Sequence, residues 1–387
     1  ETANDETIMC GVWVRLVVVA VVCVMCRATL AQSLEFSTDW GSGGANNRTV
    51  VIDRTGYIYR SGGTSQTDGP TTFGAAHAGG GESDVTIAKF APDGKLIWSR
   101  LLGGPSEDYA YVSAVGPKGE LYVSGRAGTG FPTTPNAFDR TFNGGIGGGP
   151  HKPTDAFVAK LSPDGELDYS TYIGGNGDEN GRAIHLLPSG RLIVAGGNTT
   201  STNLPTERGT VPGPVLKPQR GGSKDSWVAM LSADGSSLDF CTYFGPDDDR
   251  ERRGDETIRG LGVDAAGNIW IGGTTHGGDM TPTPDAFQKH RGSPPPAGDA
   301  YVAKLSPDGR RLVYFSWLGG SGNDEIETEG VSDAAGNFYV AGSTASADFP
   351  ATENGFQRQL KGGGQGAWDG DGWVCLLYTS DAADDTQ

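Results

Sequence analysis

The sequence predicts an all-β protein built from repeated four-stranded antiparallel units. Glycine accounts for 63 of the 387 residues and proline for 22, and glycine at about twice its usual frequency penalises long helices. Hydrophobic residues make up 36% of the chain, which is too many for a wholly disordered protein. A short segment also recurs at near-constant spacing along the chain. Together these observations exclude a helical or disordered protein and favour a series of small sheets.

The recurring segment begins with an aspartate and continues as an apolar run. Its copies start at Asp84, Asp155, Asp225, Asp299 and Asp371, so successive starts lie 71, 70, 74 and 72 residues apart. The second copy reads Asp-Ala-Phe-Val-Ala-Lys-Leu-Ser-Pro-Asp-Gly, the copies at Asp84, Asp225 and Asp299 match it at most positions, and residues 371–374 begin a fifth copy. Such agreement at a fixed period indicates one structural unit used several times.

Each unit divides into four short strands. In the second copy, the first strand is predicted over residues 156–161 and ends at a Ser-Pro-Asp-Gly turn, where Pro163 presets φ and Gly165 accepts a positive φ. The second strand is predicted over 167–173 and the fourth over 192–196, with the third between them. Aromatic and β-branched residues fill these strands. Several strands are apolar on both faces, as expected of a sheet that lies between two neighbours.

Four-stranded antiparallel units of this length, about five of them visible, predict a β-propeller. One such sheet cannot bury both faces alone, so the blades must stack around an axis. A β-solenoid is the alternative, but solenoid coils are usually shorter than this period. Residues 37–63 carry only a third and a fourth strand. Pairing of this N-terminal half with the C-terminal one would close five blades, whereas a longer parent protein would close at six or seven.

The two ends of the chain differ from the repeats. Residues 1–32 hold upstream residues and an apolar stretch that ends in small residues, which is typical of a secretory signal peptide cut after Ala31. A retained N-terminal anchor is the alternative. Residues 33–374 carry the repeats, and residues 375–387 depart from the pattern and resemble a non-native tail derived from a sequencing adapter. A genuine but divergent tail is the alternative there.

These features predict a protein that is secreted, extracellular or at the cell surface, with the periplasm as an alternative. No membrane insertion is expected after signal cleavage, and the chain is expected to be part of a longer polypeptide. Cys241 and Cys375 stand far apart in the sequence, so no disulfide framework is expected. Lysine and arginine total 30 against 47 aspartates and glutamates, a formal net charge of −17, which argues against nucleic acid as a partner.

The repeats resemble the bacterial SBBP repeat family, which is named for seven-bladed β-propellers. The family pattern ends in an element of the form Phe-Pro-Thr-Thr-Pro-x-Ala-Phe, and residues 131–138 match it. Eroded versions occur at residues 281–287 and 349–356. The resemblance covers about residues 40–374 and implies a secreted or surface-exposed bacterial propeller. It carries over no catalytic residues, because the family attaches none to these motifs.

Acidic clusters that follow the second strand of several units suggest calcium as a ligand, because calcium prefers several oxygen donors. The candidate ligands are Asp178, Glu179, Asp324 and Glu325. No cluster has the spacing of an EF-hand or of a nonapeptide calcium repeat. Acidic residues in glycine-rich turns usually remain solvated or cap their own backbone. Calcium therefore stays an option, and no other cofactor is expected.

No catalytic constellation is recognisable in the sequence. The five histidines are scattered without the spacing of metal ligands, and no Gly-x-Ser-x-Gly elbow follows a strand. The sequence therefore leans against an enzyme and predicts a binding, adhesion or structural scaffold module for an extracellular glycan or protein. Recognition is expected in the long connections between units, residues 126–154, 198–224, 274–298 and 343–370, which could equally be spacers. The alternative is a secreted glycan-active hydrolase or lyase with carboxylates at the mouth of the propeller.

Overall fold

The computed structural model describes residues 37, 45–65, 71–73, 83–145, 153–247, 256–295, 297–361 and 370–378. The predicted signal peptide, residues 1–32, and residues 379–387 of the predicted tail lie outside them. The chain divides into two units, Glu1–Asp39 and Trp40–Gln387, and the fold below concerns the second. Every regular element in the described residues is a β-strand. None of these residues belongs to a helix long and apolar enough to cross a membrane.

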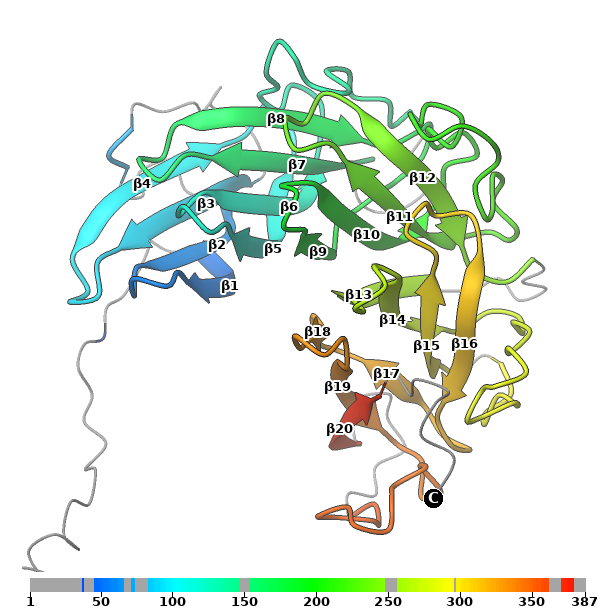
Figure 1. Cartoon of the computed structure of the whole chain (residues 1–387). Helices are drawn as coiled ribbons and strands as arrows, with labels where there is room; N and C mark the ends of the chain where they lie inside the picture. The colour runs from blue at the N-terminus through cyan, green and yellow to red at the C-terminus, as the bar shows by residue number, and fades with distance from the viewer. Residues whose placement is uncertain are drawn as a thin grey trace, which may run out of the picture. The chain divides into compact units, whose positions relative to one another are not determined.

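The strands form five antiparallel sheets in the described part of the chain, each made of strands consecutive in the sequence (Figure 1). Sheet 1 contains β1 (Ala45–Ile52), β2 (Ile58–Thr64), β3 (Asp84–Phe90) and β4 (Leu96–Leu102). Sheet 2 contains β5 (Asp108–Val115), β6 (Leu121–Ala127), β7 (Asp155–Leu161) and β8 (Leu167–Ile173). Sheet 3 contains β9 (Ala183–Leu186), β10 (Leu192–Thr199), β11 (Asp225–Leu231) and β12 (Leu238–Phe244).

Sheet 4 contains β13 (Glu256–Val263), β14 (Ile269–Thr275), β15 (Asp299–Leu305) and β16 (Leu312–Leu318). Sheet 5 contains β17 (Asp324–Ile326), β18 (Val331–Ser332), β19 (Phe338–Thr344) and β20 (Asp371–Leu377), and β19 pairs with the other three. Repeated four-stranded antiparallel sheets of this kind are the blades of a β-propeller. The predicted fold class is confirmed.

Each blade joins the last two strands of one sequence repeat to the first two of the next. The N-terminal half-unit, β1 and β2, pairs with β3 through a full register from Ile58↔Phe90 to Thr64↔Asp84. Because that hairpin completes sheet 1 together with β3 and β4, the described residues do not show the pairing of the N-terminal half with the C-terminal half that the five-blade alternative requires. The neighbouring hairpin is nearer along the chain, and bringing it into the sheet costs less loop entropy.

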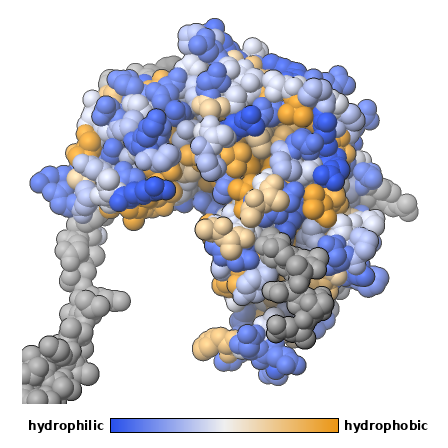
Figure 2. All heavy atoms as spheres, viewed as in Figure 1, coloured by the Kyte–Doolittle hydropathy of each residue, from blue (hydrophilic) through white to orange (hydrophobic). Residues whose placement is uncertain are grey.

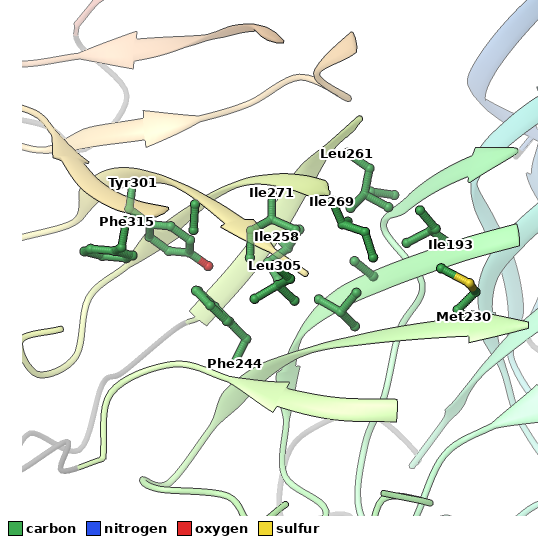
Figure 3. Close-up of a cluster of buried hydrophobic side chains, with 14 of the residues drawn as sticks. Ile193, Met230, Phe244, Ile258, Leu261, Ile269, Ile271, Tyr301, Leu305 and Phe315 are labelled. Atoms are coloured by element: carbon green, nitrogen blue, oxygen red, sulfur yellow. The ribbon is translucent and has the colours of Figure 1, made fainter. Parts of the chain in front are cut away.

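One apolar cluster fills each junction between consecutive sheets. Figure 3 shows the cluster between sheets 3 and 4, where Ile193 and Met230 of sheet 3 meet Leu261 and Ile269 of sheet 4. Successive side chains of a strand serve different junctions. Phe157 packs between sheets 1 and 2, while Val158 packs between sheets 2 and 3, and both are fully buried. This confirms that the doubly apolar strands lie between two sheets.

The predicted turn chemistry also appears in the structure. In the Ser-Pro-Asp-Gly turn of sheet 2, the N–H of Gly165 donates to the carbonyl of Ser162 at 2.9 Å. Gly165 has φ of +88°, a conformation that residues with a side chain rarely adopt. A Cβ there would also lie 2.7 Å from the ring of Phe73, so both backbone conformation and packing require glycine.

Strand β20 runs through the predicted boundary between repeats and tail. Cys375 pairs with Val340, and Leu377 pairs with Phe338, so residues 375–377 belong to sheet 5. The origin of residues 375–387 stays a prediction.

Hydrophilic side chains predominate on the face of the molecule drawn in Figure 2, with smaller hydrophobic patches among them. Val374 on β20 is one of the exposed large hydrophobic residues.

The packing between sheets can be tested at one repeat position that is buried in one copy and exposed in another. Ile87 on β3 is fully buried, whereas Val374 on β20 is 81% exposed. We expect Ile87→Ala to lower the free energy of unfolding by about 2–5 kcal/mol, through lost burial and a residual cavity. Val374→Ala should change it by less than about 0.5 kcal/mol. Urea unfolding followed by tryptophan fluorescence measures both, and equal effects would contradict this source of stability.

Candidate functional site

A pocket of about 420 Å³ lies where the first strands of the sheets meet. Its lining comes from all five sheets and consists of Arg48, Tyr111, Arg182, Arg259 and residues 327–329. We call it the axial pocket. Its volume falls in the range of pockets that hold small ligands.

A β-bulge positions most of these side chains. Strands β1, β5 and β13 each shift register by one residue against their neighbours, and the residues skipped are Arg48, Tyr111 and Arg259. Arg182 stands at the equivalent place directly before β9, where its N–H donates to the carbonyl of Ala195 at 2.8 Å. Because a bulge redirects its extra residue away from the regular pleat, one repeat position supplies the pocket from four sheets.

Sheet 5 contributes acidic residues at the corresponding place. Glu327 follows β17, and its N–H donates to the carbonyl of Ala341 at 3.1 Å, as Arg182 does to its own neighbouring strand. Glu327 forms an ion pair with Arg259 across the pocket. Glu329 lies two residues further along and is exposed. Partial desolvation raises its pKa above that of a free glutamate.

The remaining two arginines gather around one aromatic ring. The guanidinium of Arg182 lies 3.9 Å from the ring centre of Tyr111, and that of Arg48 lies 5.6 Å from it. Such cation–π contacts position a guanidinium but leave its charge uncompensated. Within the described ranges, neither Arg48 nor Arg182 forms an ion pair with a carboxylate, in contrast to Arg259.

The positive charges of the pocket repel one another. Burial lowers the pKa of Arg182, and the charges of Arg259, Arg48 and Arg126 lower it further. This concentration of positive charge occurs in a chain whose formal net charge is −17. A bound anion would relieve the repulsion and accept charge-assisted hydrogen bonds from the guanidinium groups. The chemistry of Arg48 and Arg182 therefore suits an anionic group as a ligand.

The predicted calcium ligands do not form one site. Glu179 and Asp324 are almost fully buried and accept backbone hydrogen bonds, from the N–H groups of Gly175 at 2.8 Å and Gly320 at 2.7 Å. In the part of the chain that the structure describes, no group of three or more His, Cys, Asp or Glu side chains is arranged to hold a metal ion. Calcium binding stays a prediction that the structure does not test.

The other two candidate ligands have different neighbours. Asp178 accepts a hydrogen bond from the N–H of Thr154 at 3.1 Å. Glu325 accepts one from Asn323 Nδ2 at 2.8 Å, and its carboxylate lies 3.7 Å from His276 Nε2. Each acidic cluster of the sequence therefore splits, with one carboxylate turned into a junction between sheets and the other toward a loop.

Buried carboxylates in fact occur in pairs at the junctions. One member begins the third strand of a sheet, and the other begins the next sheet or, in the case of Glu179, lies shortly before its first strand. The pairs are Asp84 with Asp108, Asp155 with Glu179, Asp225 with Glu256, and Asp299 with Asp324. All eight side chains are nearly or fully buried. Burial raises the pKa of Asp108 to about 7 and that of Glu256 to about 8, and the partner carboxylate adds to both shifts.

The long connections predicted for recognition lie partly along the outer strands. The N–H of Thr134 donates to the carbonyl of Ser170 on β8, and that of Thr283 donates to the carbonyl of Phe315 on β16, each at 3.1 Å. These segments therefore hold the outer edge of a blade, which favours the interpretation as spacers for this part of each connection.

Sequence reasoning missed the axial pocket because it searched for acidic clusters and catalytic motifs. The available signal was the position before the apolar run of each third strand of the repeat, where Arg48, Tyr111, Arg182 and Arg259 recur in successive copies. A large polar or charged side chain in the same place of an otherwise apolar strand points to a shared environment. The sequence does not show that these positions lie together, because that depends on how the sheets converge in the folded protein.

Comparisons with known proteins find distant structural neighbours and no family. No family model matches the chain, and no curated protein matches it, so the resemblance to the SBBP family stays a prediction. Among solved structures, a candidate gluconolactonase is 17% identical with a TM-score of 0.30, covering 76% of this chain and 70% of that one. A glucose dehydrogenase is 12% identical with a TM-score of 0.35, covering 78% of this chain and 80% of that one.

The sequence-based expectation that leaned against an enzyme is contradicted by these comparisons, because both structural neighbours carry the names of enzymes. That expectation is withdrawn. TM-scores this low do not indicate which reaction, if any, this chain catalyses.

The buried carboxylates predict a stability that falls with rising pH. Unfolded Asp and Glu titrate near pH 3.9 and 4.3, whereas burial raises Asp108 to about 7 and Glu256 to about 8. The preference of the fold for their protonated forms therefore stabilises it fully below about pH 4. This stabilisation decreases as the pH rises and is gone above about pH 7 to 8. The total loss for each group is roughly 1.4 kcal/mol per unit by which folding raises its pKa. Urea unfolding at pH 5 and pH 9 should show the loss.

The variants Asp108→Asn and Glu256→Gln provide the control for this titration. Each removes one titrating group, so the difference in unfolding free energy between the two pH values should shrink, whatever the absolute cost of the substitution. A pH dependence that both variants leave unchanged would contradict the assignment.

Proposed function

We propose that this protein is a glycan-active β-propeller that binds the carboxylate of an acidic sugar in its axial pocket. The observation that carries the proposal is the pair Arg48 and Arg182, which face Tyr111 without a carboxylate partner among the described residues. The planar guanidinium fork matches a carboxylate in two parallel hydrogen bonds. A pocket of about 420 Å³ has room for one or two sugar units.

The proposal places the protein outside the cytoplasm, where a polysaccharide would meet it. The apolar segment within residues 1–32 supports export, and the repeat pattern supports a bacterial propeller of the SBBP type. Recognition then rests on the axial pocket, with the connections between strands in a secondary role.

Of the two reactions considered from the sequence, elimination by a lyase suits the lining better than hydrolysis. Hydrolysis of a glycosidic bond needs two carboxyl groups as acid and base or nucleophile. In the axial pocket Glu327 is paired with Arg259, so Glu329 is the lining carboxylate without an arginine partner. Elimination instead needs cations that neutralise the sugar carboxylate and one base that removes the adjacent proton.

The proposed step is balanced without a further reactant. Glu329 takes the proton from the carbon next to the sugar carboxylate, a carbon–carbon double bond forms, and the bond to the neighbouring glycosidic oxygen breaks. The departing oxygen takes a proton from water or from the hydroxyl of Tyr111. Arg48 and Arg182 stabilise the negative charge that builds on the sugar carboxylate in the transition state. The raised pKa of Glu329 brings its proton affinity closer to that of a base working near neutral pH.

Binding is tested by titrating oligogalacturonate into the full chain and measuring heat by calorimetry. Arg182→Ala should weaken binding by about tenfold or more, because a hydrogen bond to a charged group contributes about 1.5–3 kcal/mol. Arg54→Ala provides the matched control, since Arg54 is exposed in the β1–β2 turn of sheet 1 outside the pocket lining. A neutral oligosaccharide that binds as tightly as the uronate would contradict the carboxylate assignment.

Chemistry is tested separately from binding. Incubation with polygalacturonate, alginate or another uronate polymer should produce the ultraviolet absorbance of a double bond conjugated to a carboxylate. Glu329→Gln should abolish this signal and leave calorimetric binding within about threefold, because the substitution removes the base and keeps the size of the side chain. Binding without any rise in absorbance would reject the lyase and leave a binding module.

A further inference from the structure

The backbone around Arg182 is held by both of the sheets between which it lies. The N–H of Arg182 donates to the carbonyl of Ala195 in sheet 3 at 2.8 Å, and the N–H of the preceding Gly181 donates to the carbonyl of Gly125 in sheet 2 at 2.9 Å. A Cβ at Gly181 would collide with Ser124 Oγ, so the chain lies directly against sheet 2 here. Arg182 therefore starts from a fixed position at the axial pocket.

Two further contacts set the direction of the Arg182 guanidinium. It lies 3.9 Å from the ring centre of Tyr111, and its Nε donates a hydrogen bond to Oδ1 of Asn180 at 3.2 Å. The first contact comes from sheet 2 and the second from the residue two positions earlier in the chain. Because a rotation of the guanidinium would break at least one of the two contacts, they hold it in one orientation.

This orientation leaves one edge of the guanidinium available. A guanidinium carries five N–H donors, one on Nε and two on each terminal nitrogen. In the part of the chain that the structure describes, the hydrogen bond from Nε to Asn180 is the one that this side chain makes. Since Asn180 engages Nε, a carboxylate forms two parallel hydrogen bonds with Arg182 only at the edge made by Nη1 and Nη2.

The position of Asn180 differs between the sheets in a way that follows the pairing of the arginines. Two residues before the pocket residue, sheets 1 to 5 carry Asn46, Tyr109, Asn180, Thr257 and Glu325 in that order. An Asn-x-Arg sequence therefore precedes Arg48 and Arg182, the two pocket arginines without a carboxylate partner in the described ranges. Arg259 follows a threonine and forms an ion pair with Glu327.

An amide oxygen and a carboxylate differ in what they do to a guanidinium. Both accept a hydrogen bond from it, but only the carboxylate cancels its charge. The charge of Arg182 is costly, because burial and the charges of Arg259, Arg48 and Arg126 all lower its pKa. An aspartate in place of Asn180 would relieve that cost. The neutral side chain instead keeps the charge of Arg182 for a ligand.

We propose that Asn180 is a positioning residue of the axial pocket, which turns the Nη1–Nη2 edge of Arg182 toward the carboxylate of the ligand and leaves the charge of the guanidinium uncompensated. The inference rests on the proposed function for the identity of the ligand, and it adds how the pocket selects acidic sugars. A planar carboxylate offers two oxygens to this edge, whereas a neutral sugar hydroxyl offers one oxygen and no charge.

Calorimetric titration of oligogalacturonate into variants of the full chain separates orientation from charge. Asn180→Ala should weaken binding about three- to tenfold, because the guanidinium loses one hydrogen bond that orients it. Asn180→Asp keeps the size and the hydrogen bond but cancels the charge, and should weaken binding by about tenfold or more, as Arg182→Ala does. The control Asn354→Asp adds the same charge at an exposed residue outside the pocket lining and should leave affinity within about twofold.

A chemical probe follows the charge of Arg182 without any sugar. Phenylglyoxal adds to the neutral form of a guanidinium, so a carboxylate that stabilises the charged form slows the reaction. Asn180→Asp should therefore slow modification of Arg182 several-fold at pH 8, while Asn180→Ala should leave its rate within about twofold. Arg259, which is paired with Glu327 in every variant, serves as the internal reference. Mass spectrometry of the digested protein measures both arginines.

Three results would overturn the proposal. They are wild-type affinity for oligogalacturonate in Asn180→Ala, wild-type affinity in Asn180→Asp, and equal slowing of Arg182 modification in both variants, which would indicate a general distortion of the pocket. A wild-type protein that binds no oligogalacturonate would reject the proposed function. In that case the modification rates still decide whether Asn180 preserves the charge of Arg182, so the two failures are distinguishable.

Discussion

The packing of one sheet against the next is the constraint on which the rest of this structure depends. Sheets 2, 3 and 4 each pack an apolar cluster on both faces, so removal of either neighbour exposes a surface that only another sheet can cover. Fully buried aromatic residues such as Phe157, Trp227 and Tyr301 recur at the same place in successive third strands and fill these junctions. Stacking in chain order then brings the first strands of all sheets together, and the axial pocket is a consequence of that convergence.

Some positions of the repeat are constrained by the packing between sheets, and others are not. The third-strand aspartate, as in Asp155 or Asp299, is buried at a junction and accepts hydrogen bonds from backbone N–H groups. The residue must carry a hydrogen-bond acceptor, because the buried backbone N–H groups around it need a partner. The bulge residue of the first strand faces the axial pocket and serves no junction, so it is free to differ between copies as Arg48, Tyr111 and Arg259 do. Charged and aromatic side chains can therefore occupy the bulge positions without disturbing the packing between sheets.

The axial pocket follows from the convergence of the sheets. At the axis, sheets converge and polar side chains collect in a confined space, where burial and the neighbouring arginines lower the pKa of Arg182. The pocket depends on side chains that vary between copies.

Local chemistry allowed the sequence by itself to determine the strands, the turns and the repeated sheet. Pro163 and Gly165 specify a turn, and the doubly apolar run beside them specifies a strand between two sheets, because both preferences act within a few residues. Tertiary structure alone decided that β1 and β2 share a sheet with β3, that Glu179 turns into a junction while Asp178 does not, and that Arg48 and Arg182 meet at Tyr111. Those outcomes depend on contacts between residues in different repeats. Sequence patterns indicate which side chains are buried. Which way each side chain points and which residue it contacts are decided only when the sheets pack together.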